Sequence, residues 1–505
     1  MRLFAGLNLL EGALHASSQL APAPTRPARS AGRPAVDRGR PPAPVGEPVS
    51  AGPSLDPVVD ARGRERLWTG PQGAVVAGVF ATAFLFAFES YAIATALPLV
   101  AADLDGLSLV GVSFAVMLAA SVVTMTVSAP WCDREGPTLP LLTGVAGFVG
   151  GLVVSGTAPT MELFVVGRAV QGLGSGLTTV ALYVLVGQAF DERVRPRVFV
   201  VLTSAWVLPA LVGPPVAGWV AETAGWRWAV LGAIVPAVLA ALLLAPALGT
   251  PGAHADVRLR PRRLLLATVA ALSVLAVSVA GQRGFALWWV ALLTALVVAV
   301  LVVPPLLPPG TWTGRRGLPT VIATRGVVSL AFFGIEAYLP LALVEHRGLT
   351  PTQGGMFLTG GAVLWFSGSW LAANVPALAD KHRRVRLGVG LVALGSVAGG
   401  LVLVEAVPLV LLVLLWPLAG LGMGMATSTL SVLLLETAPA GEHGAASAAM
   451  QTNDAVVQAM GLALGSAVFA ALLTRSSETA FAAVLGASPV VALAALWLSG
   501  RLRER

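Results

Sequence analysis

Two glutamates lie inside long apolar stretches of the chain, and each is followed two positions later by a tyrosine. Glu89 and Tyr91 occur in FLFAFESYAIATALP, and Glu336 and Tyr338 occur in FFGIEAYLPLAL, 247 positions further along. A charged side chain at the centre of a bilayer costs about 2.5–3.5 kcal/mol on insertion scales, and such residues commonly mark substrate or ion pathways. The glutamates therefore predict binding of a proton or a cation; the alternative is a structural hydrogen bond across a helix bundle.

Three further ionisable side chains, Arg168, Arg325 and Asp454, also lie in apolar runs. At about 1.5 Å per residue, Glu89 lies roughly 14 Å and Arg168 roughly 11 Å from the same edge of the apolar layer. We therefore expect an ion pair between them, which would keep Glu89 ionised. Asp454 and Arg325 share a depth measured from the opposite edge, so they predict a second ion pair, either purely structural or involved directly in coupling.

Helices that cross a membrane must position these side chains. Of the 505 residues, 56% are hydrophobic and 11% are charged, and the mean hydropathy is +0.82, whereas a soluble domain is about 25% charged. The chain contains fourteen apolar runs, each long enough to cross a hydrocarbon layer of ~30 Å as a helix. These runs lie near 74–98, 108–128, 138–157, 161–187, 198–221, 227–248, 263–281, 285–307, 319–344, 353–376, 387–405, 407–436, 446–474 and 479–499.

Most charges fall in the gaps between the runs, which argues against a nucleic-acid partner. With the amino terminus inside, twenty Arg and Lys residues lie in cytoplasmic gaps and four in the opposite gaps. This asymmetry predicts a multi-pass protein of the cell membrane with an even number of spans and both termini in the cytoplasm. Residues 1–70 are rich in Pro, Ala and Arg, so we expect a disordered cytoplasmic tail or a start codon placed too far upstream. Cys132 is the only cysteine, so no internal disulfide can form.

The offset between the two Glu-x-Tyr pairs recurs in two other features. Asp133-Arg134 returns as Asp380-Lys381 after 247 residues, and GLGSGLTT, which begins at Gly172, returns as GLGMGMAT after 248 residues. Three features in the same order at nearly one offset predict a duplicated unit of six helices with an inserted pair. The predicted parts are the tail 1–70, a first bundle 71–250, a two-helix insert 251–312 and a second bundle 313–500. A parallel duplication of this kind is typical of transporters.

Several motifs resemble those of the major facilitator superfamily. FVVGRAVQGLGSG is similar to its fourth-helix motif, through Arg168, Gln171 and Gly172, and ALVGPPVAG to its fifth-helix antiporter motif, through Gly213, Pro214 and Gly218. GWRWAV resembles the start of the sixth helix in drug exporters, and ATALPLVAADL the end of the first. Together with fourteen helices, the resemblance over about residues 74–500 implies the drug:proton antiporter branch and an all-α fold of two six-helix bundles plus an inserted pair.

The family's gating loop between the second and third helices is only partly matched. APWCDREGPT keeps Asp133 and Arg134, but it lacks the first glycine and the closing basic pair of the family pattern. The second copy, LADKHRRVR, keeps Asp380 and Lys381 with two further arginines. The resemblance therefore implies that the second copy carries more of the gating role.

The two halves differ at the position of the buried arginine. Aligning the glycine motifs places Trp416 opposite Arg168, so Glu336 lacks the corresponding cation. Burial without a cation favours the protonated carboxyl. We therefore expect Glu336 to carry the proton and Glu89 to act as a charge-paired partner in binding. Tyr91 and Tyr338 either donate hydrogen bonds to a substrate or a carboxylate, or only pack.

No nucleotide site is predicted. GLGSG lies within an apolar helix rather than after a strand, and GK, which a P-loop requires, never occurs. Transport would then depend on an ion gradient, with a proton as the coupling ion and no other cofactor. We expect a monomeric exporter of small amphipathic or cationic compounds, not an enzyme. A metabolite-specific transporter and a non-transporting receptor on the same fold are the alternatives.

Overall fold

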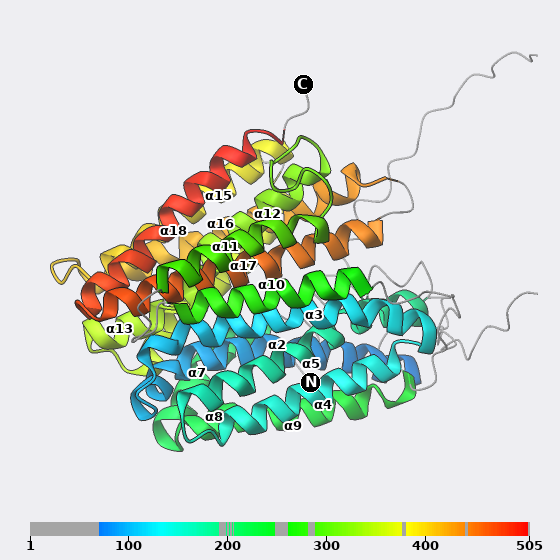
Figure 1. Cartoon of the computed structure of the whole chain (residues 1–505), viewed down its shortest axis with the longest axis horizontal. Helices are drawn as coiled ribbons and strands as arrows, with labels where there is room; N and C mark the ends of the chain where they lie inside the picture. The colour runs from blue at the N-terminus through cyan, green and yellow to red at the C-terminus, as the bar shows by residue number, and fades with distance from the viewer. Residues whose placement is uncertain are drawn as a thin grey trace, which may run out of the picture. The chain divides into compact units, whose positions relative to one another are not determined.

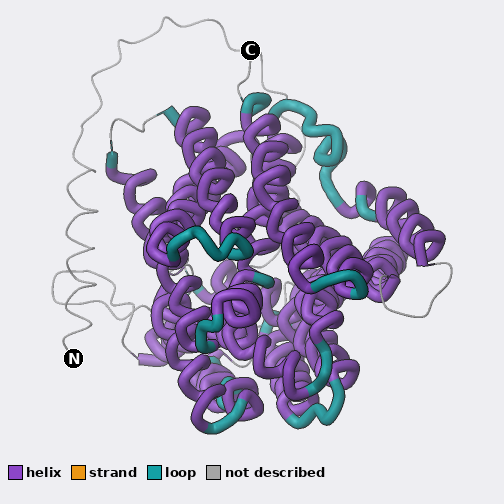
Figure 2. Tube along the Cα trace, turned by 90° about the vertical axis from the view of Figure 1, so that its left-hand side faces the viewer, coloured by secondary structure: helices purple, strands orange, loops and turns teal. Residues whose placement is uncertain are grey.

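The computed structural model describes residues 70–190, 198, 201, 205, 207–247, 261–280, 288–375, 380–439 and 443–502. Within these residues the regular elements are all helices, joined by short loops (Figure 2). Except for Gly70, which begins the first of the described helices, the predicted tail lies outside the described residues.

In the described part of the chain, seven α-helices precede residue 250, seven follow residue 313 and two lie between them. Figure 1 shows how they are arranged. The first set is α2 (Gly70–Asp103), α3 (Val110–Glu135), α4 (Thr138–Gly156), α5 (Met161–Ala189), α7 (Val207–Thr223), α8 (Trp226–Leu231) and α9 (Ile234–Leu243). The middle pair is α10 (Pro261–Ala280) and α11 (Trp288–Val302). The last set is α12 (Leu318–Glu336), α13 (Leu339–Arg347), α14 (Pro351–Asn374), α15 (Lys381–Leu401), α16 (Leu409–Thr437), α17 (His443–Leu473) and α18 (Ser477–Ser499).

Short 3₁₀ turns and side-chain caps mark several helix ends. The turns are Leu107–Leu109, Ala245–Ala247 and Pro304–Leu306. Thr350 and Gln353 form a capping box at the start of α14, which satisfies backbone N–H groups that have no partner within the helix. Gly348 adopts a left-handed conformation and ends α13, a position that glycine accepts without strain.

Twelve segments among the described residues are long and apolar enough to cross a membrane. In this count α8 and α9 form one span, and α12 and α13 form another. The predicted runs 198–221 and 285–307 correspond to α7, with 17 residues, and α11, with 15. Both are helical, but they are shorter than the other spans, and the chain on one side of each lies outside the described residues. The total of fourteen is therefore not confirmed and stays a prediction.

The glycine motifs place equivalent helices in equivalent positions. A Cβ added to Gly172 would lie 2.2 Å from a carbonyl oxygen of α3, and one added to Gly174 would lie 2.3 Å from a backbone nitrogen of α4. In the second copy, Gly420 would meet α14 at 1.8 Å and Gly422 would meet α15 at 2.3 Å. Small residues let helix backbones approach this closely. Each motif thus holds one helix against two neighbours, α5 against α3 and α4, and α16 against α14 and α15. The predicted boundaries at 250 and 312 stay predictions.

Helices of the two halves meet along two seams. α7 packs on α14, and α3 packs on α17. The inserted helix α10 packs against both α3 and α17, and α11 packs on α10. Figure 1 shows these helices side by side. Ala267 and Ala270 of α10 belong to a buried cluster with Val122 of α3 and Val456 of α17. The insert therefore covers the seam between α3 and α17.

Candidate functional site

Glu89 and Arg168 form an ion pair inside the first half. Arg168 Nη1 of α5 donates to Glu89 Oε1 of α2, and both side chains are almost completely buried. The structure thus contains the pair that helix depth predicted. Oε2 of Glu89 has no hydrogen-bond partner among the described residues, so one carboxylate oxygen remains available inside the bundle.

A hydrogen-bond network continues from Arg168. Its Nη1 also donates to the side-chain oxygen of Gln171, and its Nε donates to the Ser113 carbonyl of α3 at 3.4 Å. Gln171 in turn donates to Ser155 Oγ of α4 at 3.0 Å. The fourth-helix motif therefore fixes the arginine between three neighbouring helices. Because burying a charge is costly unless it is paired, this network explains why both members tolerate complete burial.

Glu336 has a different environment in the second half. It is 8% exposed and forms no hydrogen bond or ion pair within the described part of the chain. Trp416, which occupies the place of Arg168, is 1% exposed and stacks on Phe332 with ring centroids 5.0 Å apart. Phe332 also meets Trp365 edge to face at 5.4 Å. An aromatic cluster thus replaces the polar network one helical turn before Glu336.

The tyrosines of the two Glu-x-Tyr pairs both interact with the opposite half. Tyr91 of α2 lies within electrostatic range of Glu336 of α12. The hydroxyl of Tyr338 lies where a Cβ on Gly111 of α3 would be, 2.0 Å away, and it has no hydrogen-bond partner among the described residues. Neither tyrosine therefore donates to the glutamate of its own pair. The repeated motif places its tyrosine at the contact between the halves.

Arg325 and Asp454 form a second ion pair, which is partly buried. Arg325 Nε of α12 donates to Asp454 Oδ2 of α17 at 2.9 Å, and Nη1 donates to the Thr427 carbonyl of α16 at 3.1 Å. The structure contains this predicted pair as well. It also brings Tyr183 of α5 within electrostatic range of Arg325. Sequence reasoning missed Tyr183; the only available signal was that it is the third tyrosine, two turns beyond the glycine motif.

The fifth-helix motif lies on the seam between α7 and α14. A Cβ on Gly218 would lie 2.6 Å from Thr352 Cα, and a Cβ on Gly355 of α14 would lie 3.1 Å from Pro214 Cβ. Gly213 lies against α2 at ordinary contact distance from Tyr91. One turn beyond Gly218, the side chain of Glu222 accepts a hydrogen bond of 2.7 Å from the backbone N–H of Thr352. Sequence reasoning had not identified Glu222.

The two copies of the gating motif adopt different structures. Asp133 and Arg134 lie in the last turn of α3 rather than in a gap, and the described residues provide no ion-pair partner for either. Asp380 instead caps α15 by accepting from the backbone N–H groups of His382 at 2.9 Å and Arg383 at 3.2 Å. Lys381 pairs with Glu436 at the end of α16. The second copy therefore has contacts that the first lacks.

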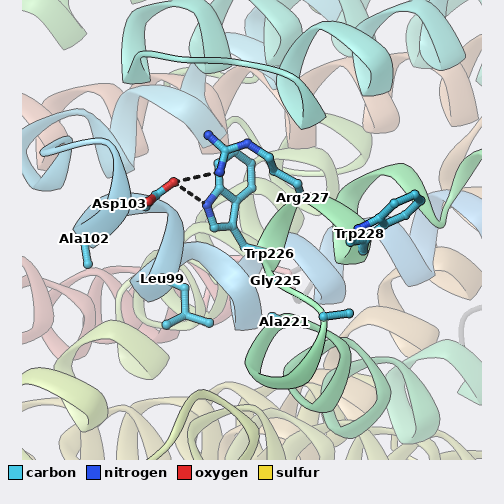
Figure 3. Close-up of a pocket in the computed structure, with 9 residues that line it drawn as sticks. Leu99, Ala102, Asp103, Ala221, Gly225, Trp226, Arg227 and Trp228 are labelled. Atoms are coloured by element: carbon cyan, nitrogen blue, oxygen red, sulfur yellow. Dashed lines mark hydrogen bonds and ion pairs between the residues drawn. The ribbon is translucent and has the colours of Figure 1, made fainter.

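A shallow pocket lies where α2 ends and α8 begins (Figure 3). Asp103 Oδ2 accepts from Trp226 Nε1 at 2.9 Å and from Arg227 Nη1 at 2.8 Å. The Arg227 guanidinium also lies 4.3 Å from the centroid of the Trp226 ring and donates to the Ala158 carbonyl. Asp103 and Arg227 are therefore hydrogen-bonded to each other. The GWRW motif thus joins the end of α2 to the start of α8. Among the described residues, no group of three His, Cys, Asp or Glu side chains could hold a metal ion.

The known proteins that this chain resembles are membrane transporters. A family model described as Major Facilitator Superfamily matches residues 79–462. A probable multidrug-efflux transporter of Mycobacterium tuberculosis is 30% identical over 405 residues, which cover 76% of this chain and 85% of the relative. The multidrug efflux pump SdrM of Staphylococcus aureus is 24% identical over 364 residues, which cover 70% of this chain and 80% of the pump.

Solved structures show the same fold at low sequence identity. A peptide transporter POT bound to alafosfalin aligns with a TM-score of 0.62 and 16% identity, covering 85% of this chain and 94% of the transporter. The human organic anion transporter MFSD10 aligns with a TM-score of 0.55 and 15% identity, and the alignment covers 85% of this chain and 100% of the transporter. At such identities the likeness shows the fold and not the substrate.

Proposed function

Because the chain belongs to the Major Facilitator Superfamily and is a multi-pass membrane transporter rather than an enzyme, we propose that it is a proton-coupled exporter of small amphipathic or cationic compounds. The multidrug-efflux relatives, at 24% to 30% identity over most of the chain, support export of drug-like compounds. Proton coupling and antiport rest on the site itself.

The observation that carries the coupling proposal is the difference between the two buried glutamates. Glu89 forms an ion pair with Arg168, whereas Glu336 has an aromatic cluster at the position that corresponds to the arginine. An unpaired carboxyl in such a place favours its protonated form, yet it can still ionise when water or a cation reaches it. Glu336 is therefore suited to bind a proton in one conformation and release it in another, while Glu89 keeps a constant charge.

In this mechanism Glu336 takes a proton from the outside as substrate leaves, and it loses the proton to the inside before the next substrate binds. One proton that crosses 100 mV supplies about 2.3 kcal/mol. Glu336 lies within electrostatic range of Tyr91 of the other half, so a change in its charge alters an interaction between the halves. That position supports a link between proton binding and their relative movement.

Among the described residues, the close glycine contacts between the halves lie at one end of the bundle. Gly218 meets Thr352 there, and Gly111 meets Tyr338. The distribution of arginines predicts that this end faces the outside. We therefore infer that this conformation is closed to the outside, and that opening requires these glycine contacts to separate.

Uphill transport in proteoliposomes tests the proposal, with ethidium as a planar cationic probe and an imposed pH gradient. Glu336→Gln is expected to abolish accumulation against the ethidium gradient while exchange without a gradient persists. Glu345→Gln is the matched control, because Glu345 is exposed at the end of α13 and should transport like wild type. Uphill transport by Glu336→Gln at the wild-type rate would remove Glu336 from the coupling role.

A further inference from the structure

A stripe of exposed apolar side chains follows one face of α18 and ends at an arginine. Val490, Leu493 and Trp497 are 66%, 57% and 62% exposed, and Arg501 lies in the turn that follows the helix. Their spacing of three or four residues places the three apolar side chains on one side of the helix. Since α18 is a membrane span that ends at Ser499, its apolar stripe faces lipid and Arg501 lies at the level of the headgroups.

The guanidinium of Arg501 is held in a defined position. Its Cζ lies 4.0 Å from the centroid of the Trp497 ring, a cation–π distance. Its Nη1 donates to the Thr313 carbonyl at 3.2 Å, which ties it to the loop before α12. An Arg that uses one N–H in this way keeps other donors for a ligand.

The loop before α12 adds two more arginines to the same place. A Cβ on Gly314 would lie 2.9 Å from Leu498 and 3.6 Å from Arg501 Nη1, so the loop packs on the end of α18. Arg315 and Arg316 follow directly and are exposed, as is Trp312, at 47%. The loop is fixed in turn by Thr320, whose hydroxyl donates to the Gly314 and Arg315 carbonyls.

No carboxylate neutralises this arginine group in the described part of the chain. The ion pairs there involve Arg168, Arg227, Arg325 and Lys381 but none of these three arginines. Residues 304–317 contain no acid, and the single acid of α18, Glu478, lies at its other end. Three clustered positive charges beside exposed tryptophans at a helix end form a surface suited to a phosphate that is attached to acyl chains.

We propose that Arg315, Arg316 and Arg501 form a binding site for the headgroup of an anionic phospholipid, whose acyl chain lies along Val490, Leu493 and Trp497. The arginines bind the phosphodiester through charge-assisted hydrogen bonds. The tryptophan rings lie at the interface, where their apolar bodies and N–H groups are both accommodated. The bound lipid joins the end of α18 to the start of α12, and so it braces two helices of the second half.

Thermal unfolding of the purified full-length chain in detergent, with added lipid, tests the site. Because a ligand that binds only the folded state raises the unfolding temperature, phosphatidylglycerol should raise it more than phosphatidylcholine with the same acyl chains. The phosphatidylglycerol concentration for a half-maximal rise should increase about thirtyfold in Arg315→Gln/Arg316→Gln and about fivefold in Arg501→Gln, as expected from about 1 kcal/mol per arginine near a lipid surface. Inorganic phosphate at equal concentration should have no such effect.

Arg262→Gln/Arg263→Gln is the matched control. These two exposed arginines lie in the first turn of another membrane span, α10, which packs on α3, α17 and α11. This variant should keep the wild-type response to phosphatidylglycerol. An equal loss in both double variants would show a diffuse charge effect and overturn the site, as would an equal response to both lipids or to inorganic phosphate. Unfolding temperatures without lipid show whether each variant folds, and the outcome is independent of transport activity.

Discussion

Glu222, at the end of α7, accepts a hydrogen bond of 2.7 Å from the backbone N–H of Thr352, in the first turn of α14. The two residues belong to different halves of the duplicated chain. A carboxylate is stabilised near a helix N-terminus, where N–H groups lack partners within the helix. Glu222 therefore holds the seam together at the end where Gly218 already touches Thr352.

Glu222→Gln should weaken this contact and favour opening of that end. Spin labels at Thr223 and Met356, which are both exposed, in a Cys132→Ala background would report the distance between the helix ends. We expect the population of longer distances to increase several-fold, because exposed charge-assisted contacts contribute about 1 kcal/mol. Glu345→Gln should leave the distribution unchanged, and an unchanged distribution in Glu222→Gln would exclude the proposed role.

The same contact should depend on pH. Partial burial acts to raise the pKa of Glu222, but hydrogen bonds from Thr352 and Thr350 outweigh it and leave the pKa below the usual 4.5. A lowered pKa in the closed form means that the contact is fully present above the ordinary pKa and is lost as the pH falls through the lowered one. The spin-label distance should therefore lengthen in acid for wild type. Glu222→Gln should show no such acid dependence.

Gly218→Ala should prevent the seam from closing. The added Cβ would lie 2.6 Å from Thr352 Cα, a backbone atom that cannot move alone, and overpacking of this kind costs about 1–3 kcal/mol. The same spin labels should report an open end, and transport should fall. Gly150→Ala provides the control because a Cβ there meets nothing within 4 Å. Similar behaviour of both variants would contradict the steric explanation.

Arg168→Ala should destabilise the first half strongly. It would leave Glu89 and Gln171 buried without their donor, and breaking a buried ion pair costs about 3–5 kcal/mol. The thermal unfolding temperature in detergent measures this loss. The double variant Glu89→Ala/Arg168→Ala should unfold at a higher temperature than Arg168→Ala, since no unpaired charge remains. A double variant that is less stable would contradict a role based on charge pairing.

The sequence predicted contacts within each half better than contacts between them. Helical rise placed Glu89 with Arg168, and Asp454 with Arg325, because each pair lies at one depth in neighbouring helices. The bond from Thr352 to Glu222 depends on how two separate bundles dock, and no periodicity along the chain encodes that. The sequence also did not predict that the two copies of the gating motif adopt different local structures. α3 continues through Asp133 and Arg134, whereas Asp380 is the N-cap of a new helix, α15.

Trp416→Arg would give the second half the arginine that the first half has. Trp416 stacks on Phe332, one turn from Glu336, so the new guanidinium should pair with Glu336 and hold it ionised. Ethidium transport should then lose its dependence on the pH gradient. Trp416→Phe retains an aromatic ring and should preserve that dependence.

Stability distinguishes this pairing from simple damage to the core. If the new arginine pairs with Glu336, then Trp416→Arg/Glu336→Gln should unfold at a lower temperature than Trp416→Arg, because the double variant buries a cation with no carboxylate. If both unfold at the same temperature, the arginine has not reached Glu336. The variant could instead fold and form the pair while its transport still depends on the pH gradient. That result would show that Glu336 is not the residue whose charge changes during transport.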